Sequence, residues 1–195
     1  MNRRRFLAVL AAVGAAAGGA WAWLRRRPRV EETAASEAPR APDGRPVFPE
    51  RYREALAALC NVLVPDEPDA PGAAELGAYR YLEREAARPE MQGARRILLR
   101  GATQLDVGAR AQFGGVFAAL PAADQERVVH AMLGGAGAKG TFDPAEFVRL
   151  TLALTLEGMF GDPAHGGNRD ERGWQYLRYA MHPPRPDACG GQVCR

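Results

Sequence analysis

Four polar side chains of the kinds that perform acid–base chemistry or bind metals lie close together towards the end of the chain. Glu157, Asp162, His165 and Asn168 fall within twelve residues and supply two carboxylates, an imidazole and an amide. The first three are suited to an acid–base set or a metal site, although such a site usually needs three protein ligands and this stretch has a single histidine. A stand-alone binding or metal-dependent protein that uses these three residues is therefore one hypothesis.

The residues around these groups favour a shaped turn instead. The stretch is dense in residues that form turns, and it ends beside a tryptophan: Gly158, Pro163, Gly166, Gly167 and Trp174. Glycine permits close approach of backbones, and Asp and Asn side chains bond their own backbone in turns. We predict that Asp162 and Asn168 cap turns and that Glu157 accepts hydrogen bonds from loop N–H groups. The stretch is then a structural or partner-docking loop.

No other motif indicates catalysis or a bound cofactor. No nucleophile is paired with a base, and no glycine-rich phosphate loop follows a strand. The acidic segment 65–72 does not match the twelve-residue calcium loop of an EF-hand, so a solvated loop is the better interpretation. The sequence predicts no catalytic residue, no metal site and no cofactor within this chain.

The three cysteines divide into one core residue and one pair. Cys60 lies on an apolar helical face, which predicts a buried thiol. Cys189 and Cys194 are not followed by histidine, so a c-type haem attachment motif is absent. In an oxidising compartment a local Cys189–Cys194 disulfide is favoured. A bond from one of them to a partner and a metal site in the tail are the alternatives.

The elements that must position these groups are helical. The chain is 47% hydrophobic, with 22 glycines and 15 prolines between its apolar segments, and has no alternating strand pattern. We predict a single irregular all-α bundle of about five to seven helices. Apolar spacing places helices at 48–63, 73–87, 91–107 and 109–119, another from residue 121, a long one from Pro144 and a short one at Trp174. Asp143 should cap the long helix, with Phe142 and Phe147 packed across the cap.

The first 24 residues have the features of an export signal. Arg3 and Arg4, one further residue, and then Phe6 and Leu7 match the twin-arginine pattern, followed by an apolar run to residue 24. An ordinary Sec signal or a retained membrane anchor formed by residues 7–24 is the alternative. The sequence therefore predicts a periplasmic protein, exported by the twin-arginine route and either released or anchored to the inner membrane.

The remaining chain divides by composition. Residues 25–47 have few large apolar side chains and are predicted to be a disordered linker, 48–183 a helical domain and 184–195 a cysteine-containing tail. Seven arginines in the first 29 residues exceed the net charge of +3, so the rest of the chain is slightly acidic. The basic charge belongs to the leader and does not indicate a nucleic-acid partner.

Three blocks of sequence carry a resemblance to a known family. They are Arg3-Arg4-Arg5-Phe6-Leu7; Val64-Pro65-Asp66 with Pro71-Gly72-Ala73 and Leu76-Gly77; and Leu156-Glu157-Gly158 with Asp162-Pro163-Ala164-His165-Gly166-Gly167-Asn168 and Gly173-Trp174. With them the chain resembles the gluconate 2-dehydrogenase subunit 3 family, the small subunit of membrane-bound flavin dehydrogenases. The third block is the most specific of the three.

The resemblance implies a non-catalytic role. In such complexes a large subunit binds FAD and oxidises a sugar or sugar acid, and a cytochrome c subunit often passes the electrons on. The small subunit carries the export signal and helps the large subunit to mature and to cross the membrane through the twin-arginine translocase. The expected partners are therefore the FAD-dependent large subunit, the translocase and a cytochrome c subunit, and FAD is expected in the partner.

Overall fold

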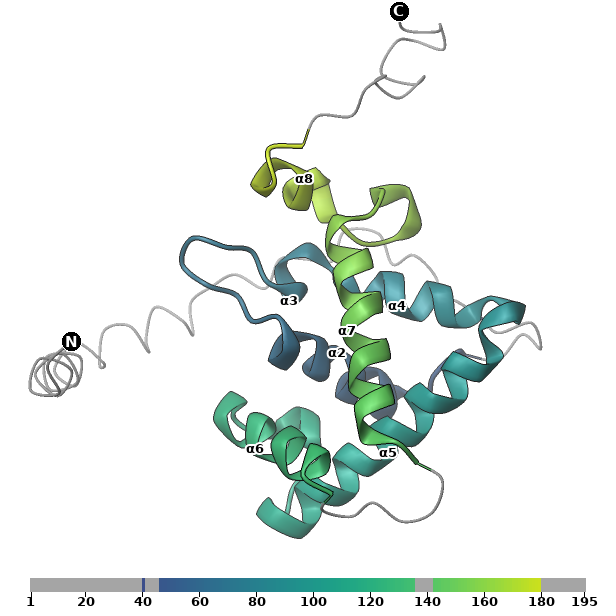
Figure 1. Cartoon of the computed structure of the whole chain (residues 1–195), viewed down its shortest axis with the longest axis vertical. Coiled ribbons are helices and arrows are strands. Elements are labelled where there is room, and N and C mark those ends of the chain that lie inside the picture. Colours follow the sequence, from purple (N-terminus) through teal and green to yellow (C-terminus); the bar gives the residue numbers. More distant parts are fainter. Residues whose placement is uncertain (1–39, 41–45, 136–141, 180–195) are drawn as a thin grey trace, which may run out of the picture. The chain divides into compact units, whose positions relative to one another are not determined.

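The computed structural model describes residue 40 and residues 46–135 and 142–179 (Figure 1). Its α-helices are α2 (Glu50–Leu63), α3 (Ala73–Leu76), α4 (Ala78–Ala87), α5 (Gln92–Phe113), α6 (Ala122–Leu133), α7 (Pro144–Phe160) and α8 (Arg172–Tyr176). Short 3-10 helices are η1 (Pro89–Met91), η2 (Phe117–Ala119), η3 (Pro163–His165) and η4 (Arg169–Glu171). Extended pairing within the described ranges amounts to two isolated β-bridges, so the predicted all-α class is confirmed.

Helix α7 starts where the sequence places its start. The Asp143 side chain accepts hydrogen bonds from the backbone N–H groups of Ala145, at 2.8 Å, and Glu146, at 3.2 Å. The rings of Phe142 and Phe147 lie 6.0 Å apart across this cap. A capping side chain and a hydrophobic contact across it together stabilise the first turn and set the direction in which the chain enters the helix.

Helix α7 is the element around which the other helices pack. It lies most extensively against α4 and also contacts α2, α3, α5, α6 and α8; Figure 1 shows it crossing in front of α2. Its inner side buries Phe147, Leu154 and Met159. Thr151 and Thr155 are buried on the same side, and their hydroxyls donate to the carbonyls of Phe147 and Thr151, four residues back in the helix. The hydroxyls therefore need no partner outside α7.

The buried thiol predicted for Cys60 is confirmed. Cys60 lies in the core on α2, with its Sγ atom 3.2 Å from the Thr155 hydroxyl oxygen on α7. Burial raises the pKa of this thiol to about 11, because the charged thiolate would be poorly solvated there. The side chain therefore acts as a small apolar residue at the contact of α2 with α7.

The predicted break between helices 91–107 and 109–119 is wrong. Helix α5 continues from Gln92 to Phe113 and passes through Gly108. A Cβ atom at Gly108 would lie 3.3 Å from a Val128 methyl carbon, so the glycine lets α6 pack closely on α5. That packing offsets the cost of about 1 kcal/mol for a glycine inside a helix. The helix ends instead at Gly114, which has a φ of +74°.

The single helix predicted over 73–87 is divided. Gly77 adopts a φ of +68° and separates α3 from α4. Its N–H bonds the carbonyls of Ala73 and Ala74, which ends the short first helix. Left-handed backbone of this kind is the usual way in which a glycine terminates a helix. Helix α4, which begins after this turn, packs against α7.

Several predicted features lie outside the described residues. These are the export-signal residues Arg3, Arg4, Phe6 and Leu7, most of the predicted linker, and Cys189 and Cys194. Chain contacts separate residues 1–38 from residues 39–195, and every described residue belongs to the second unit. In that unit Val47 and Phe48 are buried, so packed residues precede α2. None of the helices in the described ranges combines the length and the apolar character needed to cross a bilayer.

Candidate functional site at the end of helix α7

The buried side chain of Asn168 ties the loop between α7 and α8 to the end of α7. Its backbone N–H donates to the carbonyl of Gly158 at 2.6 Å. Its side-chain nitrogen donates to the carbonyl of Gly161 at 2.8 Å, and its side-chain oxygen accepts from the N–H of Gly173 at 2.8 Å. One residue thus connects α7, the loop and α8. The prediction that Asn168 caps a turn is wrong, because its side chain makes no capping bond to η4 and reaches Gly161 and Gly173 instead.

The remaining hydrogen bonds complete a cap on α7. The last carbonyl groups of a helix have no partner within it and must find one elsewhere. The Trp174 indole nitrogen donates to the carbonyl of Phe160 at 2.7 Å, and the N–H of Gly161 donates to the carbonyl of Glu157 at 2.7 Å. The residues that follow α7 in the sequence are therefore used to satisfy its own C-terminus.

Three glycines of this region sit where no side chain would fit. A Cβ atom at Gly158 would lie 2.7 Å from the carbonyl oxygen of Ala78 on α4. One at Gly167 would lie 2.0 Å from the carbonyl oxygen of Gly158, and one at Gly173 would lie 2.1 Å from that of Met159. Because backbone atoms occupy the space of a Cβ atom at these three positions, close packing requires glycine at each of them.

The side chains of Glu157, Asp162 and His165 each have different surroundings. The Glu157 carboxylate accepts from the Tyr81 hydroxyl on α4 at 2.9 Å, and the loop N–H of Gly161 reaches only the backbone carbonyl of Glu157, not the carboxylate. Burial, and then the hydrogen bond to Glu157 and the charge of Glu157, raise the pKa of Tyr81 to about 12. Asp162 accepts from the N–H of Ala164 at 2.8 Å, which confirms the predicted turn cap. His165 is the last residue of that turn, and its side chain is exposed.

The geometry therefore does not assemble an acid–base or metal centre from these residues. Among residues 40, 46–135 and 142–179, no group of three or more His, Cys, Asp and Glu side chains could hold a metal ion. Pro163, Gly166 and Gly167 shape the turn, and Arg84 on α4 donates to the carbonyl of Ala164 at 2.8 Å. The loop is thus held to α4 as well as to α7.

Two further features of the structure were not predicted from the sequence. Arg53 on α2 and the buried Glu83 on α4 form an ion pair with Nε and Oε1 3.0 Å apart, and burial raises the pKa of Glu83 despite Arg53. Asn168, Asp170 and Glu171 all have positive φ values, of 44°, 56° and 58°. Residues other than glycine adopt this conformation at some cost, so the surrounding contacts must impose it.

The described helices pack around the apolar helix α7, and Asn168 and Trp174 of the following segment close its C-terminal end. The chain matches the family described as Gluconate 2-dehydrogenase subunit 3 over residues 50–180, a range that includes all the described helices. The chain belongs to this family, as its sequence motifs predict. Its family is that of a subunit of a dehydrogenase complex. No curated protein and no solved structure matches it.

Proposed function

We propose that this chain is a non-catalytic accessory subunit of a periplasmic FAD-dependent dehydrogenase that acts on gluconate or a related sugar. The observation that carries the proposal is the Asn168-centred cap. In the loop that follows α7, the buried Asn168 closes the end of the helix through hydrogen bonds with Gly158, Gly161 and Gly173. Family membership supplies the partner, because the family is that of a dehydrogenase subunit.

The accessory role has two parts in this proposal. The leader carries the twin-arginine signal, Arg3 and Arg4 with Phe6 and Leu7, and the folded domain binds the catalytic subunit so that both cross the membrane together. The twin-arginine translocase is the export partner, and a cytochrome c subunit accepts electrons from the catalytic subunit. FAD belongs to the catalytic subunit, and this chain contributes no reacting group.

Substitution of His165 by alanine should leave the complex intact. The side chain is exposed, and the loop around it is held by backbone contacts and by Asp162. The full chain, tagged and purified from membranes of its native host, is expected to bring down a dehydrogenase with its FAD, seen by mass spectrometry and visible absorption. FAD per chain should be the same for His165→Ala and wild type. A metal or ligand bound to the lone wild-type chain and lost in His165→Ala would contradict the proposal.

Substitution of both signal arginines by lysine should retain the complex in the cytoplasm. Twin-arginine signals are read by a receptor, so equal charge does not replace them. Periplasmic dehydrogenase activity, measured in separated cell fractions, should fall at least about tenfold for Arg3→Lys with Arg4→Lys, a loss of recognition of roughly 1.4 kcal/mol or more. The matched control is Arg25→Lys with Arg26→Lys, which should export normally. Undiminished export by the first variant would point to the Sec route and overturn the escort role.

A further inference from the structure

The outward side of α7 is unusually apolar for a helix with an exposed side. Only three of its seventeen residues are charged, namely Glu146, Arg149 and Glu157. Beyond Arg149 the outward positions are half-buried Leu152, exposed Ala153, Leu156, which is 41% exposed, and exposed Glu157. A helix covered on one side only normally carries polar residues on the other, so this pattern indicates a second covering.

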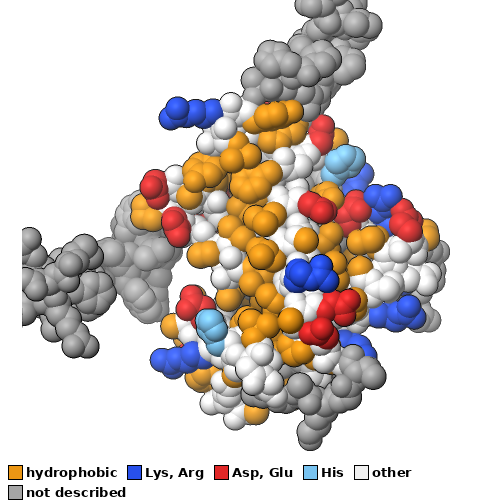
Figure 2. All heavy atoms as spheres, in the orientation of Figure 1, with side chains coloured by type: hydrophobic (Ala, Val, Ile, Leu, Met, Phe, Trp, Pro, Cys, Tyr) orange, Lys and Arg blue, Asp and Glu red, His pale blue; other side chains and the backbone are white. Residues whose placement is uncertain are grey.

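Helix α8 and the residues after it extend this apolar surface. Tyr176, Leu177 and Tyr179 are 49%, 53% and 55% exposed. Four of the seven exposed large hydrophobic side chains in the described ranges are these three and Leu156. Figure 2 shows hydrophobic side chains continuing from the α8 end along the middle of the molecule, over α7. We call the surface formed by Leu152, Leu156, Tyr176, Leu177 and Tyr179 the α7–α8 face.

The cap on α7 holds the aromatic end of this face in place. Gly173 and Trp174 of α8 are bonded to Asn168 and to the carbonyl of Phe160. Tyr179 donates its N–H to the carbonyl of Trp174 at 2.8 Å, and the two rings meet edge to face with centroids 5.6 Å apart. Side chains held in position before binding lose less conformational entropy when a partner arrives. Tyrosine is also among the residues that contribute most to binding energy at interfaces.

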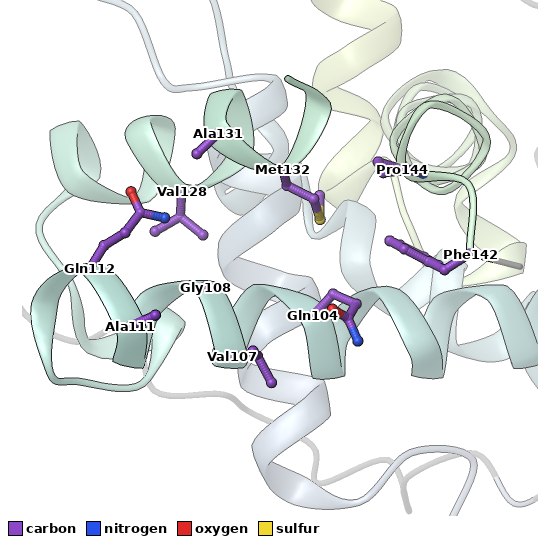
Figure 3. A pocket seen from close by; sticks show the side chains of 10 residues that line it. All are labelled: Gln104, Val107, Gly108, Ala111, Gln112, Val128, Ala131, Met132, Phe142 and Pro144. Carbon is purple, nitrogen blue, oxygen red and sulfur yellow. The ribbon is translucent and has the colours of Figure 1, made fainter. Parts of the chain in front are cut away.

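The α7–α8 face extends from the middle of α7, a helix of seventeen residues and about 25 Å, to the residues that follow α8. An apolar hollow lies elsewhere, between α5, α6 and the start of α7, and has a volume of about 220 Å³. Figure 3 shows Val107, Val128, Met132 and Phe142 around it. That hollow accommodates one or two side chains, and Val107 at its rim provides a matched control position.

We propose that the α7–α8 face is where the catalytic subunit of the dehydrogenase complex binds. The inference rests on the proposed function. The family match spans residues 50–180, so the property shared by a family of dehydrogenase subunits must reside in these helices, and the face lies wholly within that range. A partner carried across a membrane must remain bound, and permanent interfaces are the more hydrophobic ones. The apolar composition of the face fits such a partner.

Crosslinking from the face identifies its occupant directly. A photoreactive amino acid replaces Leu177 in the otherwise unchanged full chain, expressed in the native host, and in a matched variant it replaces Val107, which is 51% exposed on α5. The expected result is a crosslink from position 177, and not from 107, to a polypeptide identified as the FAD-containing dehydrogenase subunit. A crosslink from 177 to a second copy of this chain or to lipid would overturn the assignment.

Substitution then measures how much the face contributes. Leu156→Ser combined with Leu177→Ser should reduce the FAD subunit recovered with the tagged chain at least about tenfold. Val107→Ser combined with Leu133→Ser, at exposed positions on α5 and α6, should not reduce it. Circular dichroism of each purified variant checks the fold, and the crosslink at position 177 decides the matter if the double variant does not fold.

The outcomes separate the face from the function. If wild type recovers the FAD subunit and the Leu156/Leu177 variant recovers as much, the catalytic subunit does not bind at the α7–α8 face, and the proposed accessory function stands. If wild type itself recovers no FAD subunit, the proposed function is wrong, and so is the assignment of the α7–α8 face as its binding surface.

Discussion

Replacing Asn168 by alanine should lower the free energy of unfolding by about 3 kcal/mol. The change removes the side-chain bonds to Gly161 and Gly173 and leaves the buried N–H of Gly173 without its partner. Alanine also tolerates the positive φ of this position, +44°, less well than asparagine does. Urea denaturation of the full-length chain, followed by circular dichroism, measures the effect.

Two further variants separate the causes of that loss. Asn168→Gly permits the same backbone conformation without the side-chain bonds, so it should recover about 1 kcal/mol relative to the alanine variant. Asn61→Ala changes an exposed asparagine on α2 and should alter stability by no more than about 0.5 kcal/mol. A loss below about 1 kcal/mol for Asn168→Ala would show that the loop does not depend on these bonds.

Replacing Gly173 by alanine should destabilise the protein by about 3 kcal/mol, although alanine is the better helix former. The new Cβ atom would lie 2.1 Å from the carbonyl oxygen of Met159 and 2.8 Å from the side-chain oxygen of Asn168. Both neighbours are held by the cap, so α8 must move away from α7. That displacement would also weaken the bond from Trp174 to Phe160. Thermal and urea unfolding of the full-length chain measure the loss.

Gly93 is the matched control for Gly173. It is also the second residue of a helix, α5, and nothing lies within 4 Å of a Cβ atom placed there. Gly93→Ala should therefore stabilise the protein by about 0.5–1 kcal/mol, as expected for an unobstructed helical glycine. A loss of stability for Gly173→Ala and a gain for Gly93→Ala would show that the loss arises from the contact of α8 with α7. Small and equal changes in stability for the two variants would show that α8 can move away from α7 without cost.

Local signals made several features predictable from sequence. The start of α7 depends on Asp143, Phe142 and Phe147, which interact within one turn of helix, so the pattern of residue types is sufficient. The turn cap by Asp162 spans only two residues. The all-α class follows from apolar residues at helical spacing. The third sequence block predicted the family to which the chain belongs.

Other features depend on partners that are distant in the sequence. Gly77 breaks a helix and Gly108 does not, because α6 packs at Gly108 through Val128. A single glycine therefore does not predict whether a helix ends or continues unless its neighbours in space are known. For the same reason the long helix α5 was predicted as two.

The sequence by itself determined that this chain is helical, that α7 begins at its cap, and that a dense polar loop follows α7. Only the tertiary structure decided what those polar groups do. Glu157 bonds Tyr81 from α4, 76 positions earlier, and Asn168 turns inward to the end of α7. The same residue types are compatible with catalysis, metal binding or capping. Their hydrogen-bond partners distinguish these uses, and most of those partners are brought into reach only when α4, α7 and α8 pack together.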